Sequence, residues 1–144
     1  MIALPDVNVL IALAWPNHVH HAAARSWFQE HRDGGWATCP LTEAGFVRVS
    51  CNPVAVRHSV TPLDAIAVLG KITQLGSHAF WPTDRSLLDL PEAIGPRIQG
   101  YRQITDALLL ATAMQRDGRL ATLDGGLAGL VPAGANRFLY VIPV

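Results

Sequence analysis

Short apolar runs alternate with longer helical patterns along this chain, and this alternation limits the possible folds more than any other feature. The apolar runs predict strands at residues 2–4, 36–39, 78–81, 119–123 and 138–142. Strands separated by helices favour parallel pairing, because a parallel pair needs a long crossover connection. The sequence therefore predicts an α/β fold with a mainly parallel sheet. Its 144 residues suit a single domain over residues 1–144.

Helical patterns with start and stop signals fill the gaps between the predicted strands. Thr61 followed by Pro62 is a strong start signal, because the threonine side chain can cap the helix and proline suits its first turn. Thr105 is expected to cap the last long helix, while Asn52 and Pro53 are expected to end an earlier one. Helices are predicted at residues 7–15, 19–31, 40–50, 62–75 and 106–116, with short helical turns over 86–98, and Asp84 and Asp89 are expected in caps or turns.

Composition excludes several classes of protein. Half of the residues are apolar, which rules out disorder, and no apolar run approaches the roughly 20 residues of a membrane span. Asp6 lies early in an apolar N-terminus that lacks a basic region, so we expect no signal peptide, no membrane partner and a cytoplasmic protein. Cys39 and Cys51 show no metal-type spacing and are expected to be reduced. Eleven basic residues balance eleven acidic ones, which argues against a nonspecific polyanion binder.

Four of the eleven acidic residues fall where predicted strands give way to helices or turns. Asp6 follows the first strand, Glu43 begins the helix after the second, Asp106 begins the last long helix, and Asp124 closes the strand at 119–123. Junctions at the carboxyl ends of parallel strands gather at one edge of the sheet, where ligands bind. Taken singly, each acid has an ordinary structural explanation. Asp6 suits a helix cap, Glu43 a solvated first turn, Asp106 a contact with the helix dipole and Asp124 a turn. Taken together, they predict one acidic site.

An acidic site of this kind needs a cation. Two carboxylates about 4 Å apart repel by roughly 4 kcal/mol at an effective dielectric constant near 20. Four carboxylates together either take up protons or bind a divalent ion, and oxygen ligands suit Mg²⁺ or Mn²⁺ better than zinc. Such an ion could activate water against a phosphodiester. Thr122 and Asn8 lie beside these acids in the sequence and are expected to orient a water molecule.

Three segments carry a resemblance to a known family: LPDVNVLIALA, LTEAGFVRV and ITDALLLATAMQRDGRLATLD. They resemble the PIN-domain ribonucleases, in particular the VapC toxins of type II toxin–antitoxin systems, and the likeness spans nearly the whole chain. FWPTDRSLLDL also resembles a stretch that many such toxins carry. The family often has a basic or bulky residue after its fourth acid, whereas Gly125 and Gly126 follow Asp124 here.

The resemblance implies a site, an activity and partners. Asp6 and Asp106 would be primary Mg²⁺ ligands, Glu43 a ligand or a residue that orients the attacking water, and Asp124 the fourth acid, with Thr122 behind them. The implied fold is a parallel sheet of about five strands between helices. The implied activity is endoribonuclease, often on loops of tRNA or ribosomal RNA, which stops translation. A cognate VapB antitoxin and a second copy of the chain are the implied partners.

The sequence lacks residues that several other functions of α/β domains require. A haloacid-dehalogenase type phosphatase needs a second Asp where Asn8 stands, and a phospho-receiver domain needs a lysine near the last strands, whereas Lys71 falls inside a predicted helix. No phosphate-binding GxxxxGK[ST] loop is present. A non-catalytic module of the same fold that binds RNA or protein stays open as the alternative. Candidates for phosphate or antitoxin contact are Arg48, Arg85, Arg102 and Arg119.

Overall fold

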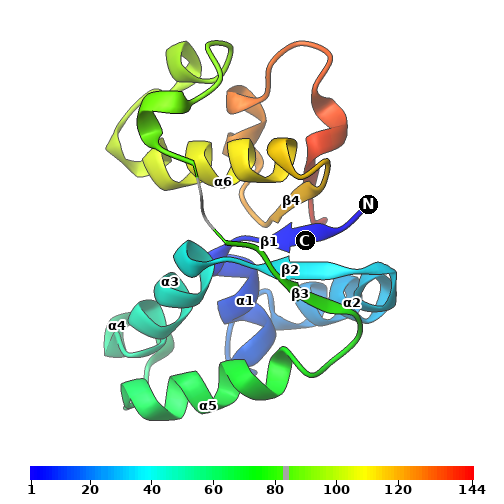
Figure 1. Ribbon diagram of the computed structural model, residues 1–144. Helices are drawn as coiled ribbons and strands as arrows, with labels where there is room; N and C mark the ends of the chain where they lie inside the picture. Colours follow the sequence, from blue (N-terminus) through cyan, green and yellow to red (C-terminus); the bar gives the residue numbers. More distant parts are fainter. Residues whose placement is uncertain (83–84) are drawn as a thin grey trace.

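A five-stranded parallel sheet forms the centre of the protein in a computed structural model that describes residues 1–82 and 85–144 (Figure 1). The strand order is β3-β2-β1-β4-β5, and every neighbouring pair is parallel. The fold class predicted from the alternation of elements is therefore confirmed. The strands are β1 (Ala3–Pro5), β2 (Trp36–Thr38), β3 (His78–Phe80), β4 (Arg119–Thr122) and β5 (Leu139–Val141).

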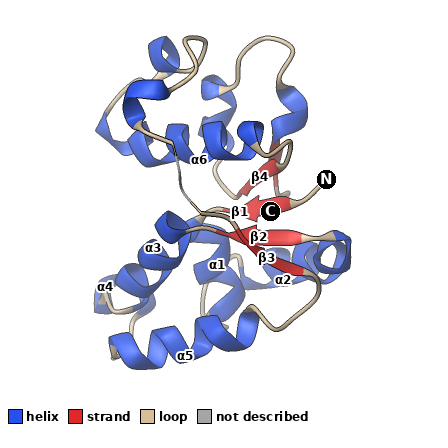
Figure 2. Ribbon diagram, viewed as in Figure 1, coloured by secondary structure: helices blue, strands red, loops and turns tan. Residues whose placement is uncertain are grey.

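Helices cover both faces of the sheet (Figure 2). α1, α2, α3 and α5 pack on one face, while α6 and several short 3-10 helices cover the other. The helices are α1 (Val7–Ala14), α2 (His21–His31), α3 (Pro40–Ser50), α4 (Pro53–Val56), α5 (Pro62–Ile72) and α6 (Ile104–Gln115). Within the described residues, no helix has the length and apolar character needed to cross a membrane.

Alternate residues of each central strand enter two separate apolar cores. Ala3, Trp36 and Ala121 face α1, α2, α3 and α5, whereas Leu4 and Leu120 face α6. A strand whose successive side chains point to opposite faces must be apolar throughout when both faces are covered. This requirement explains why the predicted strands read as continuous apolar runs.

The predicted cap of the last long helix was wrong. Thr105 does not cap the last long helix, because a 3-10 turn over Tyr101–Gln103 already gives the chain helical geometry and α6 begins at Ile104. α3 ends at Ser50, as predicted, and Pro53 then begins the unpredicted short helix α4, where Asn52 accepts a hydrogen bond from the Val54 amide as the N-cap. The predicted cap at Thr61 is confirmed by its hydrogen bond from the Asp64 amide. Asp84 lies outside the described residues.

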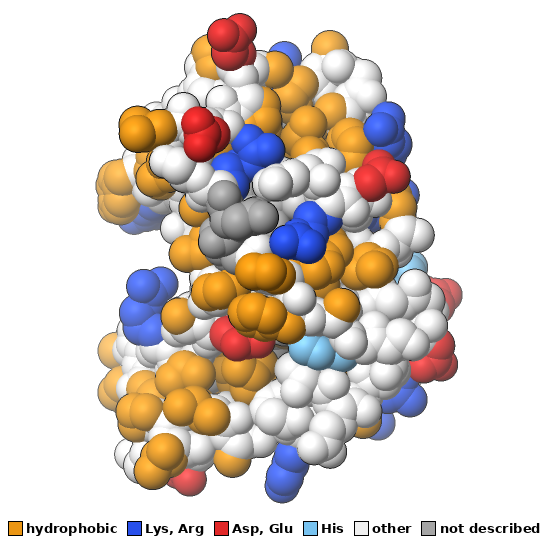
Figure 3. All heavy atoms as spheres, viewed as in Figure 1, with side chains coloured by type: hydrophobic (Ala, Val, Ile, Leu, Met, Phe, Trp, Pro, Cys, Tyr) orange, Lys and Arg blue, Asp and Glu red, His pale blue; other side chains and the backbone are white. Residues whose placement is uncertain are grey.

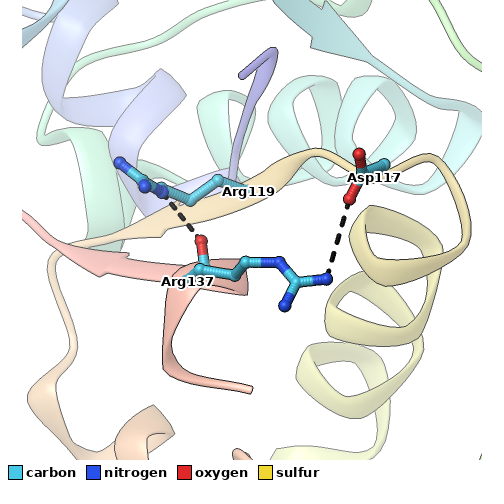
Figure 4. A network of polar contacts seen from close by, with 3 residues as sticks. All are labelled: Asp117, Arg119 and Arg137. Carbon is cyan, nitrogen blue, oxygen red and sulfur yellow. Dashed lines mark hydrogen bonds and ion pairs between the residues drawn. The ribbon is translucent and has the colours of Figure 1, made fainter. Parts of the chain in front are cut away.

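Polar contacts secure the edge strand β5 beside β4. Arg119 of β4 donates through Nε to the Arg137 carbonyl at 2.9 Å, and Arg137 lies 4.0 Å from Asp117 in an exposed ion pair (Figure 4). Exposed ion pairs add little stability, so the bond to the carbonyl is the more useful contact. It holds the turn before β5 against β4, where Leu120 pairs with Leu139.

The strand order places a switch in direction between β1 and β4. The chain builds outward from β1 through β2 to β3, then returns to the other side of β1 and continues through β4 to β5. The helices that follow the two halves lie on opposite faces, and a crevice therefore opens between the carboxyl ends of β1 and β4. This crevice is the expected ligand site of such a sheet.

Close packing of α1 against α3 sets the positions of the residues that flank the crevice. A Cβ atom added at Gly45 of α3 would lie 2.5 Å from Cγ2 of Val7 in α1, closer than real carbon atoms approach. Glycine at position 45 is therefore required by contact between the helices, since the two backbones could not otherwise lie so near each other.

We predict that Gly45→Ala destabilises the protein by about 1–3 kcal/mol, because the added methyl group forces α1 and α3 apart. The matched control is Gly70→Ala in α5, where an added Cβ meets no atom within 4 Å. That control should stabilise the protein by up to about 1 kcal/mol through helix propensity. Chemical unfolding of both variants measures the two effects, and equal shifts in the same direction would contradict the proposed contact.

Candidate active site

Asp6 lies at the junction between β1 and α1 and is the only buried residue among the four predicted site acids. Its side chain is 5% exposed and accepts a hydrogen bond from the Val9 amide, which makes Asp6 the N-cap of α1. Thr122, the last residue of β4, donates its hydroxyl to Asp6 Oδ2 over 2.5 Å. The two strands that border the crevice thus meet through a direct side-chain contact.

The Asp6 carboxyl group has an unusual pKa. Burial raises it from 3.8 to about 6, since a charged carboxylate loses its hydration there. The Thr122 hydroxyl and the Val9 amide oppose this rise by stabilising the anion, while negative charge on Asp106 and Asp124 adds to it. Repulsion from two further acids shows that they share one electrostatic environment with Asp6.

Asp106 and Asp124 approach the crevice from the opposite side of the sheet. Asp106 lies in the first turn of α6 and is half-buried, and its pKa is raised by burial and then by the charge of Asp124. Asp124 follows β4 and caps a 3-10 helix at Gly125–Leu130 by accepting from the Gly126 amide at 2.8 Å. The Asp124 amide also donates to Thr122 Oγ1 at 3.0 Å. Thr122 therefore links Asp6 with the turn that carries Asp124.

Glu43 takes a different direction from the three aspartates. It lies in the first turn of α3, and its Oε2 accepts a 2.7 Å hydrogen bond from the hydroxyl of Thr38, the last residue of β2. The same hydroxyl oxygen lies 2.8 Å from Nε2 of His78. Burial lowers the pKa of His78, and the Glu43 charge opposes that effect. Glu43 is thus at the predicted edge but contacts Thr38 instead of the aspartates.

A surface pocket of about 250 Å³ opens over Asp6 and Asp106, and Asp124 does not line it. Asp6 and Asp106 line it together with Asn8, and Arg48 and Arg102 bring two positive charges to it. Figure 3 shows the surface hollowed on the side where the part of the molecule around α6 faces the part around α3. Thr105, which sequence analysis expected to cap α6, lines this pocket instead.

The donor atoms in this pocket suit a hard divalent cation. The Asp6 and Asp106 carboxylates and the Asn8 amide could supply oxygen ligands, and burial raises the pKa of the Asp6 carboxyl group to about 6. Among the described residues, no three acidic, histidine or cysteine side chains lie close enough to enclose a metal ion. Magnesium commonly needs only one or two protein carboxylates, with water and substrate phosphate completing its shell. The residues present therefore fit Mg²⁺ or Mn²⁺.

Thr38 and His78 were not predicted as site residues, yet they are linked to one of the predicted acids. Thr38 is hydrogen-bonded both to Glu43 and to His78, although Thr38 and His78 come from different strands and lie 40 residues apart. Nothing in the local sequence marks this contact, since it depends on parallel pairing of β2 with β3. The roles of Asp6, Glu43, Asp106 and Asp124 in catalysis or metal binding stay a prediction, as do those of Asn8 and Thr122.

Comparison with known proteins identifies the class of this fold and site. The family model described as PIN domain matches residues 3–130. Ribonuclease VapC39 of Mycobacterium tuberculosis (strain H37Rv) is 49% identical over 139 residues, covering 96% of this chain and 100% of that protein. Ribonuclease VapC38 of the same strain is 51% identical over 126 residues, covering 88% of this chain and 87% of that protein. The chain belongs to the PIN-domain family and, within it, to the VapC group.

A solved structure supports the fold. The crystal structure of VapC20 from Mycobacterium tuberculosis, described as a Sarcin–Ricin loop cleaving toxin, matches this chain with a TM-score of 0.63. The match covers 98% of this chain and 99% of that structure at 14% sequence identity. At this identity the likeness extends to the fold, and it confirms the predicted parallel sheet with flanking helices.

We predict that Asp6→Asn makes the metal-free protein more stable near neutral pH. The folded pKa of Asp6 exceeds its unfolded value, so wild-type stability falls as pH rises from about 4 to about 6 and stays reduced above that range. Asparagine carries no charge and can still cap α1. A rise of the Asp6 pKa from 3.8 to about 6 corresponds, at about 1.4 kcal/mol per pKa unit, to a gain of about 3 kcal/mol for the variant at pH 7.5 and almost nothing at pH 4.

Chemical unfolding of both proteins across this pH range in a chelating buffer measures the difference. Asp64→Asn is the control, because Asp64 is an exposed first-turn acid on α5, and it should show no comparable pH-dependent gain. An Asp6→Asn variant that is less stable than wild type at pH 7.5 would contradict the assigned pKa.

Proposed function

We propose that this protein is a Mg²⁺-dependent endoribonuclease and the toxin of a type II toxin–antitoxin pair. Its substrate would be a structured RNA, a loop of tRNA or ribosomal RNA, and its cleavage would stop translation. The observation that carries the proposal is the pocket at the crevice between β1 and β4, where Asp6 and Asp106 lie beside Arg48 and Arg102. The ribonuclease names of the M. tuberculosis relatives support the same reaction.

The charges around the pocket suit a phosphodiester backbone. Arg48 projects from the exposed side of α3, and Arg102 lies in the exposed turn before α6. Guanidinium groups bind phosphate oxygens in a bidentate manner, and they would hold the RNA backbone over the acidic floor. Without the four predicted site acids, seven acidic residues remain against eleven basic ones, so the rest of the chain carries an excess of positive charge.

The acids would divide the remaining tasks. Asp6 and Asp106 would hold the divalent cation, and Asp124 would add negative charge from the opposite side. When bound, Mg²⁺ neutralises charge on the phosphodiester and lowers the pKa of water. Thr122 and the Val9 amide keep Asp6 fixed and partly offset the cost of its burial. Glu43 would either be a further ligand of the cation or orient the attacking water from α3.

Hydrolysis by water determines the ends of the products. The water oxygen bonds to phosphorus, the bond between phosphorus and the 3′ oxygen breaks, and the leaving 3′ oxygen takes a proton. The products would carry a 5′ phosphate and a 3′ hydroxyl. No nucleophilic side chain of the protein takes part in this scheme.

Two partners belong to this proposal. A VapB-type antitoxin would cover the pocket, and a second copy of the chain would form a homodimer, as the resemblance to VapC toxins implies. The fold neighbour VapC20 is named as a toxin that cleaves the Sarcin–Ricin loop, which supports an RNA loop as the substrate class here. Exposed apolar side chains on α4 and α5, among them Val54, Leu63 and Ile66, leave surface available for protein contacts (Figure 3).

We predict that the purified protein cleaves total bacterial RNA with added Mg²⁺ or Mn²⁺ and that Asp106→Asn lowers the rate at least 100-fold, because a carboxylate that holds the cation is lost. Chelation of the cation should stop cleavage by wild type. Sequencing of the fragment ends should give 5′ phosphates. The matched control is Asp117→Asn, an exposed acid at the other end of α6, which should cleave at the wild-type rate.

Unchanged cleavage by Asp106→Asn would assign the activity to a contaminant. Fragments that end in a 2′,3′-cyclic phosphate would contradict attack by water. RNA binding without cleavage would favour the non-catalytic module.

A further inference from the structure

The side chain of Glu43 is held by a chain of contacts that the proposed reaction does not use. Thr38 is 0% exposed, and both hydrogen bonds of its hydroxyl go to ionisable side chains. The Thr38 hydroxyl donates to Glu43 Oε2, with 2.7 Å between the two oxygen atoms, and the hydroxyl oxygen lies 2.8 Å from His78 Nε2. A threonine buried only for packing would need no such partners.

The directions of these two bonds follow from the number of protons available. An ionised carboxylate has no proton to donate, so Thr38 must donate to Glu43. The Thr38 oxygen then accepts from His78, which requires a proton on Nε2 of the imidazole ring. The order of donation is therefore from His78 to Thr38 and from Thr38 to Glu43. Oε1 of Glu43 accepts no hydrogen bond from the described residues.

His78 is itself held in place by Trp36. The Trp36 side chain is fully buried, and its Nε1 donates to the Leu75 carbonyl at 2.8 Å. Its ring meets the His78 ring edge to face, with 4.7 Å between the ring centroids. Because Trp36 and His78 are also paired in register between β2 and β3, the imidazole ring is fixed by both backbone and side chain.

The same arrangement occurs on the other side of β1. Thr122 ends β4 as Thr38 ends β2, both side chains are 0% exposed, and each donates its hydroxyl to a predicted site acid. β2 and β4 are the two neighbours of β1, and the two threonines point to opposite faces of the sheet, because Thr38 lies two residues after Trp36 and Thr122 two residues after Leu120. On either side of β1, a buried threonine therefore ties a different acid to the sheet.

We propose that Thr38, oriented by His78, is a positioning residue that fixes Glu43 in one rotamer with Oε1 free for the reaction. This inference rests on the proposed function, because it assigns Thr38 a role only through Glu43. Partners behind a metal-binding or water-orienting carboxylate restrict its motion, and their removal typically lowers metal affinity or activity 10–100-fold.

Thr38→Val tests the proposal, since valine keeps the shape of threonine and removes the hydroxyl. We expect Mn²⁺ affinity, measured by calorimetry, to fall about 10-fold and kcat to fall about 10–100-fold with KM unchanged. Thr38→Ser should restore both values to within about threefold, because serine supplies the same hydroxyl. Thr112→Val is the matched control: Thr112 is a buried threonine whose hydroxyl bonds the Leu108 carbonyl within α6, and its loss should change neither value.

A double-mutant cycle on Mn²⁺ affinity separates positioning from general structure. Glu43→Ala alone should weaken binding, and Thr38→Val should weaken it no further in that background. An equal effect of Thr38→Val in both backgrounds, or no effect in wild type, would overturn the proposal. A His78→Leu variant with wild-type Mn²⁺ affinity would exclude His78 from the arrangement.

The outcomes also separate this proposal from the proposed function. If Asp106→Asn abolishes cleavage while Thr38→Val matches wild type in affinity and kcat, only the positioning role fails. If the wild-type protein neither cleaves RNA nor binds Mn²⁺, the proposed function fails first.

Discussion

Burial of the Asp6 carboxylate without a basic side chain bonded to it is the constraint around which this site is built. Desolvation raises the pKa of Asp6 to about 6, and the charges of Asp106 and Asp124 raise it further. The Val9 amide and the Thr122 hydroxyl return only part of that free energy. A protein that keeps such a group near neutral pH gives up stability at this position, and a divalent cation would recover it.

The sheet topology makes this cluster possible. Because the chain reverses direction across β1, acids from α1, α6 and the turn after β4 reach one crevice, although they lie up to 118 positions apart in the sequence. The apolar runs that form the strands bury both faces of the sheet and leave its carboxyl edge as the place for polar groups. Buried threonines at the ends of β2 and β4 then connect the rigid sheet with the acids.

The helices and strands were predicted well where the spacing of apolar residues and the capping residues indicated the same element. The five strands and the helix that Thr61 begins are examples, since each depends on neighbouring residues alone. The prediction that Thr105 caps α6 was wrong, because a 3-10 turn over Tyr101–Gln103 comes directly before the helix and α6 begins at Ile104. The positions of Asp6, Asp106 and Asp124 near one another followed from the rule for parallel sheets. The hydrogen bonds of Thr38 with Glu43 and with His78 did not, because they depend on the lateral order of β2 and β3 and on the side-chain rotamers.

The most direct test of this account is the position of Mn²⁺ in crystals, located by its anomalous scattering at pH 7.5. The account predicts one strong peak in the pocket, in contact with the carboxylates of Asp6 and Asp106 and absent from crystals of the Asp6→Asn variant. A peak elsewhere on the surface, or an empty pocket at millimolar Mn²⁺, would contradict the claim that these buried acids are held together for a divalent cation.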